Sequence, residues 1–488
     1  MDEADVRRAW WDWPALVEAV AALAVGMAFV FPGLELPALV GFADLVHGPP
    51  IEPAALACAL LVLGVSTVAL LPRLPAWPLV VAALLVALAT DGIARGAELV
   101  LTDDRPLWRV VTAVLAAVAV GLALGGVLLA VAQAPRSVRW LLSGGLAAGL
   151  VLQPASVEMV RGLVRGRESG SPVTAQLGFA ALAAVVAAIS AHRRVRDASL
   201  PAPGRPAVAP VVVVCAAGGL VVAVLAVRSS LVREYRFSPD SLSDHPERHA
   251  VQGFGHWSLV LLAVAVGVVL LGHAYRVGGV VAARWVLLCL GAGPVALFAE
   301  QTIRAPQAEP RYPIVLAVVA AVAAGAAFGR YAAGRAVPWD VLGLLVAAVA
   351  VTLATLAVRT GSPSLHPVPQ LLTVAGLGLA LAFGLSQAAC GLPGPDTDTG
   401  VVLRLLLTGP AALVLSALAL APIVTWSISG ASDAEPVLTI PGFVAATAVL
   451  LVLLLGFSRA VERFGRDLAA GPTSSPPLSP GDADGPTP

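Results

Sequence analysis

Three charged side chains lie within one apolar stretch, residues 78–101. Asp91, Arg95 and Glu98 are four and three residues apart, so a helix places all three on one face. A carboxylate held by an arginine can act as a proton-sensitive switch, because protonation of the acid releases the arginine. The alternative is that the apolar segment ends near Thr90 and leaves the three charges in a polar boundary layer.

Two further charges stand alone inside apolar runs. Glu18 lies about one turn inside residues 14–32, and Arg284 lies near one end of residues 278–300. A charge in an apolar medium is costly, which makes both residues candidates for a substrate cavity or a proton-coupling role. Both also lie close enough to the end of a run for the side chain to snorkel to the boundary instead.

Acidic and histidine side chains gather in the polar stretch 229–256. Carboxylate and imidazole groups can bind divalent metals, but their spacing here matches no metal motif, and a solvated loop is the better interpretation. The sequence also shows no phosphate-binding loop, nucleophile elbow or pair of catalytic carboxylates. We therefore expect no metal, no cofactor and no enzyme activity. The cluster consists of Asp240, Asp244, His245, Glu247, His249 and His256.

The composition places these few charges in a membrane protein. The 488 residues are 58% hydrophobic and 12% charged, against roughly 45–50% apolar and about 25% charged in soluble domains. Too little polar surface remains to cover a water-soluble body. The 30 basic and 30 acidic residues balance, which gives no reason to expect a nucleic-acid partner; the expected surroundings are a lipid bilayer.

Fourteen stretches are long and apolar enough to cross a bilayer, which takes about 20 residues. They predict an all-α polytopic membrane protein with two pseudo-symmetric six-helix bundles, residues 14–200 and 277–457, and two intervening spans within residues 201–276. Residues 229–256 form an outer loop in this scheme, and 1–13 and 458–488 are cytoplasmic ends, the latter disordered. The spans are 14–32, 54–71, 78–101, 110–132, 140–160, 175–191, 210–228, 257–275, 278–300, 313–332, 340–358, 369–390, 401–424 and 438–457.

Arginine clusters orient the chain. An even number of spans puts both ends on one side, and clusters at 193–205 and 459–466 favour the cytoplasm for that side. Every basic residue is arginine, which indicates a GC-rich genome such as that of an actinobacterium. We expect a plasma-membrane location. Glycine pairs such as Gly278-Gly279 and Gly325-x-x-x-Gly329 fit close packing of helices in lipid.

One short turn resembles a family motif. Residues 327–335 read Ala-Phe-Gly-Arg-Tyr-Ala-Ala-Gly-Arg and resemble the Gly-x-Leu-Ala-Asp-Arg-x-Gly-Arg turn of the major facilitator superfamily. Gly334 and Arg335 match the second glycine and the arginine after it, whereas Ala327 replaces the first glycine and Tyr331 replaces the aspartate. The resemblance makes Gly334, Arg335 and the nearby Asp340 candidates for a gating turn.

Other stretches carry the resemblance further. Residues 376–383, with Gly400, Arg404 and Gly409-Pro410, are similar to spans twelve and thirteen of fourteen-span drug:proton antiporters. The corresponding turn after the second span, residues 70–75, keeps nothing of the motif. The resemblance implies two bundles that rock around a central site and export a small amphipathic compound in exchange for protons.

Three functions stay open on the sequence. A transporter predicts that Asp91, Glu98 and Arg284 line one water-accessible cavity. A non-transporting scaffold derived from the same superfamily predicts a dry, packed interface between the halves. A membrane-embedded transferase acting on a lipid-linked substrate predicts a lipid-facing groove near 33–53 or 102–109, where the acidic residues Glu35, Asp44, Asp103 and Asp104 are available.

Overall fold

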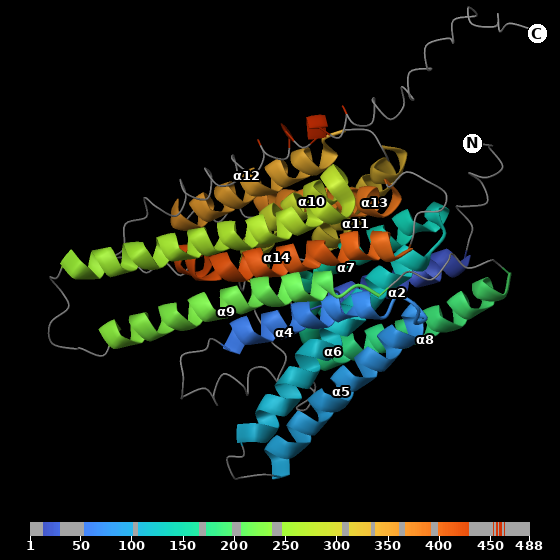
Figure 1. The fold of residues 1–488 in the computed structure, drawn as a ribbon, viewed down its shortest axis with the longest axis horizontal. Helices are drawn as coiled ribbons and strands as arrows, with labels where there is room; N and C mark the ends of the chain where they lie inside the picture. The colour runs from blue at the N-terminus through green and yellow to red at the C-terminus, as the bar shows by residue number, and fades with distance from the viewer. Residues whose placement is uncertain are drawn as a thin grey trace, which may run out of the picture.

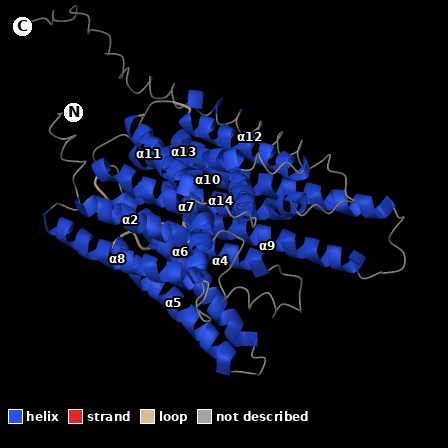
Figure 2. Cartoon of the chain, turned by 180° about the vertical axis from the view of Figure 1, so that it is seen from behind, coloured by secondary structure: helices blue, strands red, loops and turns tan. Residues whose placement is uncertain are grey.

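The computed structural model describes residues 13–29, 53–100, 106–164, 172–197, 206–236, 246–304, 312–332, 337–360, 367–391 and 399–428, with isolated positions between 452 and 463. Within these ranges the chain is helical and contains no strand (Figures 1 and 2). The helices are α2 (Trp13–Ala28), α4 (Pro53–Thr67) with the short 3₁₀ turn η1 (Val68–Leu70), α5 (Ala76–Val100), α6 (Pro106–Gln133), α7 (Arg136–Val164), α8 (Pro172–Asp197), α9 (Ala209–Arg236), α10 (Pro246–Arg304), α11 (Tyr312–Tyr331), α12 (Trp339–Thr360), α13 (Pro367–Cys390) and α14 (Thr399–Ile428).

These helices confirm the predicted all-α fold, and most begin and end within a few residues of the predicted spans. Nine helical stretches in the described part are long and apolar enough to cross a membrane, and α2, α4 and α12 add shorter apolar ones. The predicted last span, 438–457, lies outside the described residues apart from isolated positions. Part of the predicted outer loop 229–256 is helical, because α9 continues to Arg236 and α10 already begins at Pro246; its place outside the membrane stays a prediction.

Helix α10 is two antiparallel helices rather than one. Gly278 and Gly279 have non-helical dihedral angles, and Gly279 has a φ of 61°, a conformation open mainly to glycine. A Cβ at Gly267 would lie 3.3 Å from Leu290, whereas a straight helix would separate the two residues by about 34 Å. The chain therefore reverses at Gly278-Gly279, at the start of the second of the two spans predicted there. The glycine pair makes this turn, and Gly278 also packs closely, since a Cβ on it would lie 3.1 Å from the side chain of Leu405 in α14.

The helices pack in two groups. Helices α2, α4, α5, α6, α7 and α8 contact one another and form the first half; residues 280–304 of α10 form the second half with α11, α12, α13 and α14. Helix α7 packs against α11 and α13, and α4 packs against α14, so these helices form the interface between the halves. Helix α9 lies against α4 and α14 and, with the first part of α10, extends past the other helices (Figure 1).

Glycines bring helices close within each half. A Cβ at Gly149 of α7 would lie 2.8 Å from the Cα of Gly26 in α2 and closer still to the carbonyl oxygen of Leu23. In the second half, a Cβ at Gly325 or Gly329 of α11 would lie 2.5 or 2.7 Å from a backbone carbonyl oxygen of α13. This confirms the packing role predicted for Gly325 and Gly329, since only a residue without a side chain allows such an approach.

One glutamine holds the turn before α5. Gln133, the last residue of α6, accepts a hydrogen bond from the backbone N–H of Ala76 at 3.3 Å. Its amide nitrogen donates to the carbonyls of Pro72, at 3.3 Å, and Leu74, at 2.9 Å. The turn 71–75 thus has its free backbone groups satisfied by a side chain rather than by a helix.

The outer surface of the helices is apolar, as a lipid environment requires. Large aliphatic side chains are well exposed on α8, α10 and α11, including Leu182 (65%), Leu261 (66%) and Leu316 (69%). The interior is dominated by alanine, valine and leucine. An apolar surface over an apolar interior is stable only where lipid, not water, surrounds the helices.

Candidate functional site

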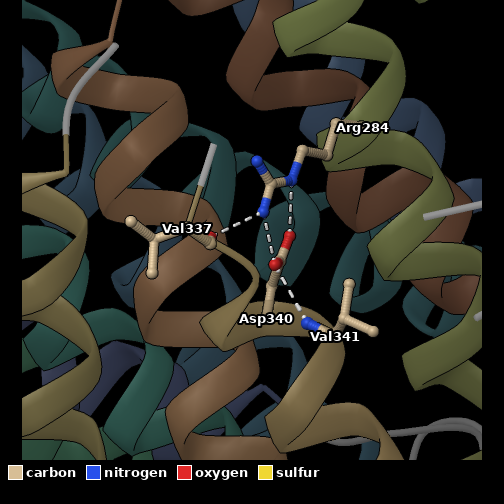
Figure 3. Close-up of polar contacts among 4 residues, drawn as sticks. All are labelled: Arg284, Val337, Asp340 and Val341. Carbon is tan, nitrogen blue, oxygen red and sulfur yellow. Dashed lines mark hydrogen bonds and ion pairs between the residues drawn. The ribbon is translucent and has the colours of Figure 1, made fainter. Parts of the chain in front are cut away.

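Arg284 and Asp340 form a buried ion pair in the second half (Figure 3). The Arg284 Nε donates to Asp340 Oδ2 at 2.8 Å, and Nη2 donates to Oδ1 at 2.5 Å. Nη2 also donates to the carbonyl of Val337 at 3.0 Å. The two side chains are 3% and 1% exposed. A paired, two-point contact of this kind offsets the cost of removing both charges from water.

Local structure places both partners. Asp340 lies in the first turn of α12, where its Oδ1 also accepts from the N–H of Val341 at 2.9 Å and its charge suits the positive end of the helix dipole. The guanidinium of Arg284 lies 5.9 Å from the ring centre of Phe383 in α13. Snorkelling is therefore the wrong interpretation of Arg284: its side chain is held inside the bundle.

The pair joins two residues that the sequence singled out for different reasons, Arg284 for a cavity and Asp340 for a gating turn. The other gating-turn candidates, Gly334 and Arg335, lie outside the described residues. Arg284 therefore connects α10 directly to the start of the helix that follows that turn.

Asp91 is buried between α5 and α8. Its side chain is 1% exposed, and Thr174 Oγ1 donates to its Oδ2 at 2.6 Å. Helix α5 continues to Val100, so the helix does not end near Thr90. Arg95 and Glu98 lie in the last part of α5, whose side chains are outside the described structure. The pairing of Asp91 with Arg95 and the role of Glu98 on the same face therefore stay predictions.

Glu18 is also buried, at 4% exposure. Trp77 of α5 donates its indole N–H to Glu18 Oε2 at 3.3 Å. The side chain lies inside the first half, so snorkelling is the wrong interpretation here as well. Both Glu18 and Trp77 lie near the first residue of their helices, α2 and α5, whereas Asp91 lies toward the other end of α5.

A pocket lies between the two halves. Residues of α7, α10, α13 and α14 line it, among them Leu150, Pro154, Ala299, Val374 and Leu413, and its empty space is about 440 Å³, counting its open side. Gln153 of α7 lies in its wall and is 1% exposed. The predicted cavity of Asp91 and Arg284 is not this pocket, since neither residue is in its wall.

Two arginines at the start of α7 connect the two halves at a different position along the helix from the pocket. Arg136 Nη2 donates to the carbonyl of Cys390 at 2.7 Å, and Arg139 Nη1 donates to the carbonyl of Ala389 at 3.1 Å. These carbonyls end α13, where a helix leaves acceptors unsatisfied and favours positive charge. We name Arg136 and Arg139 with these two carbonyls the arginine bridge.

The arginine bridge is far from the pocket along α7. Arg139 and Gln153 are separated by about 20 Å at the helical rise per residue. Arg330, near the end of α11, adds a contact at the same level, with its guanidinium 5.4 Å from the ring centre of Trp140. Arginine side chains thus join the two halves at one end of their interface, and the pocket lies nearer the other end.

Sequence reasoning missed Gln153 and the arginine bridge. A neutral glutamine gives little signal within a span, although its position directly before Pro154 marks an irregular part of the helix. Arg136 and Arg139 look like ordinary loop and boundary charges, because their acceptors are backbone carbonyls that carry no sequence signal.

The chain matches no protein-family model and no curated protein. Among solved structures it is similar to the major facilitator superfamily proton:xylose symporter XylE from E. coli, bound to 6-bromo-6-deoxy-D-glucose, with 12% identity, 93% of this chain and 94% of that chain covered, and a TM-score of 0.49. It is also similar to the human organic anion transporter MFSD10 (16% identity, 92% and 99% covered, TM-score 0.47) and to a bacterial homologue of the iron transporter ferroportin (13%, 94% and 99%, 0.41).

Proposed function

We propose that this protein is a secondary transporter of the plasma membrane that exports a small amphipathic compound in exchange for protons. The observation that carries the proposal is the pocket enclosed by α7 of the first half and α10, α13 and α14 of the second. A site between two helix groups can face either side of a membrane in turn when the groups rock. The motif resemblance at residues 327–335 points the same way.

The arginine bridge supports such a cycle. It joins the halves through hydrogen bonds from two side chains to the end of one helix, on the side predicted to be cytoplasmic. These bonds can break without disturbing the packing inside either half. Rocking would open this end and close the other.

Asp91 is the proposed proton-coupling residue. It is buried beside Thr174 of α8, and two residues farther along α8 Gln176 donates to Ser156 of α7 at 2.7 Å. Ser156 in turn donates to the backbone carbonyl of Gln153 at 2.8 Å. Helix α8 thus contacts Asp91 of α5 through Thr174 and Ser156 of α7 through Gln176, so it links the helix of Asp91 to the helix that carries Gln153 of the pocket wall.

The two other functions receive less support. A scaffold predicts a dry, fully packed interface, whereas the interface here contains a pocket. The transferase depends on Glu35, Asp44, Asp103 and Asp104, which lie outside the described residues.

Proton flux in everted vesicles tests the proposal. The vesicles are energised and challenged with the lipophilic cation tetraphenylphosphonium and the neutral amphipath chloramphenicol, with wild type, Asp91→Asn and Glu18→Gln compared. Glu18→Gln is the matched control, because it removes a buried carboxylate of the same half at the other end of α5. We expect a compound to dissipate the pH gradient in wild type and in Glu18→Gln but not in Asp91→Asn.

Each other result has a defined meaning. Loss in Glu18→Gln alone would move the coupling role to Glu18 and overturn the assignment of Asp91. Absence of a response to both compounds in every protein, with the protein shown to be present in the vesicles, would contradict the proposed export and favour the scaffold.

A further inference from the structure

We propose that the pocket binds uncharged, mainly apolar molecules that carry one amide-type group, and that Gln153 recognises this group. The inference rests on the proposed function, since it assigns a substrate class to the same pocket. Gln153 is the one polar side chain in the pocket wall within the described part of the chain. Two observations support this assignment: the amide of Gln153 has no hydrogen-bond partner among the described residues, and the rest of the pocket wall is apolar.

The amide of Gln153 is buried with no hydrogen-bond partner among the described residues for either its oxygen or its nitrogen. Buried polar groups are nearly always satisfied, since each unmet donor or acceptor costs about 1–3 kcal/mol. A glutamine left in this state in the wall of a pocket is explained when a ligand supplies the missing partners. Helix packing alone would be served better by leucine.

Pro154 removes one regular helix hydrogen bond at the same place. Its nitrogen has no hydrogen to donate to the carbonyl of Leu150, four residues earlier in α7. Both Leu150 and Pro154 are in the pocket wall. The polar part of the pocket therefore offers one donor and one acceptor from Gln153, next to a turn of helix that lacks a hydrogen bond.

The rest of the wall excludes charge. Its other residues are alanine, valine, leucine and proline, and it contains no acidic or basic side chain. A charged group moved into such surroundings without a counter-charge pays a large desolvation penalty. A polyhydroxylated molecule would leave most of its hydroxyls unpaired for the same reason.

The fitting ligand is complementary to a primary amide. A lactam, an imide or a primary amide presents N–H and C=O side by side, so it can donate to Gln153 Oε1 and accept from Nε2 at once. An aliphatic or aromatic body then packs against the apolar side chains of α7, α10, α13 and α14 that line the open side of the pocket.

Equilibrium binding to the purified protein in lipid nanodiscs tests the inference without any gradient. The probes are a radiolabelled phenyl-substituted γ-lactam, its N-methyl derivative, which cannot donate, and the matching phenylpyrrolidine, which is a cation at neutral pH. The proteins are wild type, Gln153→Leu and Ser143→Ala. Ser143 is the matched control, because it is a buried polar residue of the same helix, α7, that lies outside the pocket wall.

We expect wild type and Ser143→Ala to bind the lactam at least about tenfold more tightly than its N-methyl derivative, with no saturable binding of the cation. Gln153→Leu should lose this preference while its melting temperature stays at or above that of wild type, because an unsatisfied amide has been removed. A lactam that does not bind, a cation that binds better, or an unchanged preference in Gln153→Leu would overturn the inference.

The flux assay and the binding assay can contradict the proposed transport and the proposed substrate class independently. Lactam binding that depends on Gln153, without proton flux in vesicles challenged with the same lactam, would leave the substrate class standing and contradict transport. Proton flux with chloramphenicol or tetraphenylphosphonium, without lactam binding, would leave transport standing and contradict the substrate class.

Discussion

Arg284 and Asp340 lie 56 residues apart in the chain and meet in a two-point ion pair buried in the second half. Removing one partner leaves a buried charge without its counter-charge, which typically costs about 3–5 kcal/mol. We therefore expect Arg284→Leu or Asp340→Leu to lower the melting temperature of the purified protein sharply, as measured by thermal unfolding in detergent.

The double variant Arg284→Leu/Asp340→Leu is the control for this prediction, because it removes both charges together. It should be clearly more stable than either single variant. Equal losses that simply add in the double variant would show that the pair contributes no coupling energy.

The arginine bridge should shield Cys390 at the end of α13. The Cys390 side chain is 3% exposed, and its Sγ lies 3.9 Å from the backbone oxygen of Arg136. In a variant whose other three cysteines are replaced by alanine, Arg136→Ala/Arg139→Ala should raise the rate of maleimide labelling of Cys390 several-fold. The rate is measured in membranes under native conditions.

A chain that keeps only Cys289 serves as the control. Cys289 is 1% exposed within α10 and makes no part of the arginine bridge. The same double substitution should leave its labelling slow. Faster labelling of both cysteines would indicate general loosening of the fold and count against a specific role of the bridge.

The contact of Gly149 with α2 should not tolerate a side chain. A Cβ there would lie 2.8 Å from the Cα of Gly26, so Gly149→Ala must push two backbones apart, at a cost of about 1–3 kcal/mol. Thermal unfolding should show a lower melting temperature. Gly178→Ala on α8 is the control, because its Cβ would meet no atom within 4 Å, and its melting temperature should stay or rise.

Gln133 should stabilise the turn 71–75 through all three of its hydrogen bonds. We expect Gln133→Ala to lose about 2–3 kcal/mol, since each bond contributes about 1 kcal/mol. Gln133→Glu keeps the acceptor for Ala76 but loses both donated bonds to Pro72 and Leu74, so its melting temperature should also fall. A melting temperature of Gln133→Ala equal to that of wild type would mean that the turn is held by other contacts.

The helices could be predicted from sequence because an apolar medium leaves the backbone little choice but to satisfy its hydrogen bonds within each helix. The same physics drew attention to Asp91, Glu18 and Arg284 as costly charges. Burial of Glu18 and Arg284 could not be predicted, because snorkelling and pairing give the same sequence pattern near a helix end. The choice depends on Trp77 and Asp340, which packing brings in from other helices.

The pocket and the arginine bridge could not be predicted from the sequence, for a different reason. Gln153 stands out because neither its amide oxygen nor its amide nitrogen has a hydrogen-bond partner among the described residues, and that is a property of its neighbours. The acceptors of Arg136 and Arg139 are backbone carbonyls, which every residue possesses.

The reversal at Gly278-Gly279 ties the membrane orientation of the two arms of α10 together. Two residues reach about 7 Å at most, far less than the roughly 30 Å thickness of the hydrocarbon core. The end of the first arm and the start of the second must therefore lie at the same face of the bilayer. A topology reporter that orients one arm also orients the other, although the finished protein uses them differently: one lies beside α9, and the other carries Arg284.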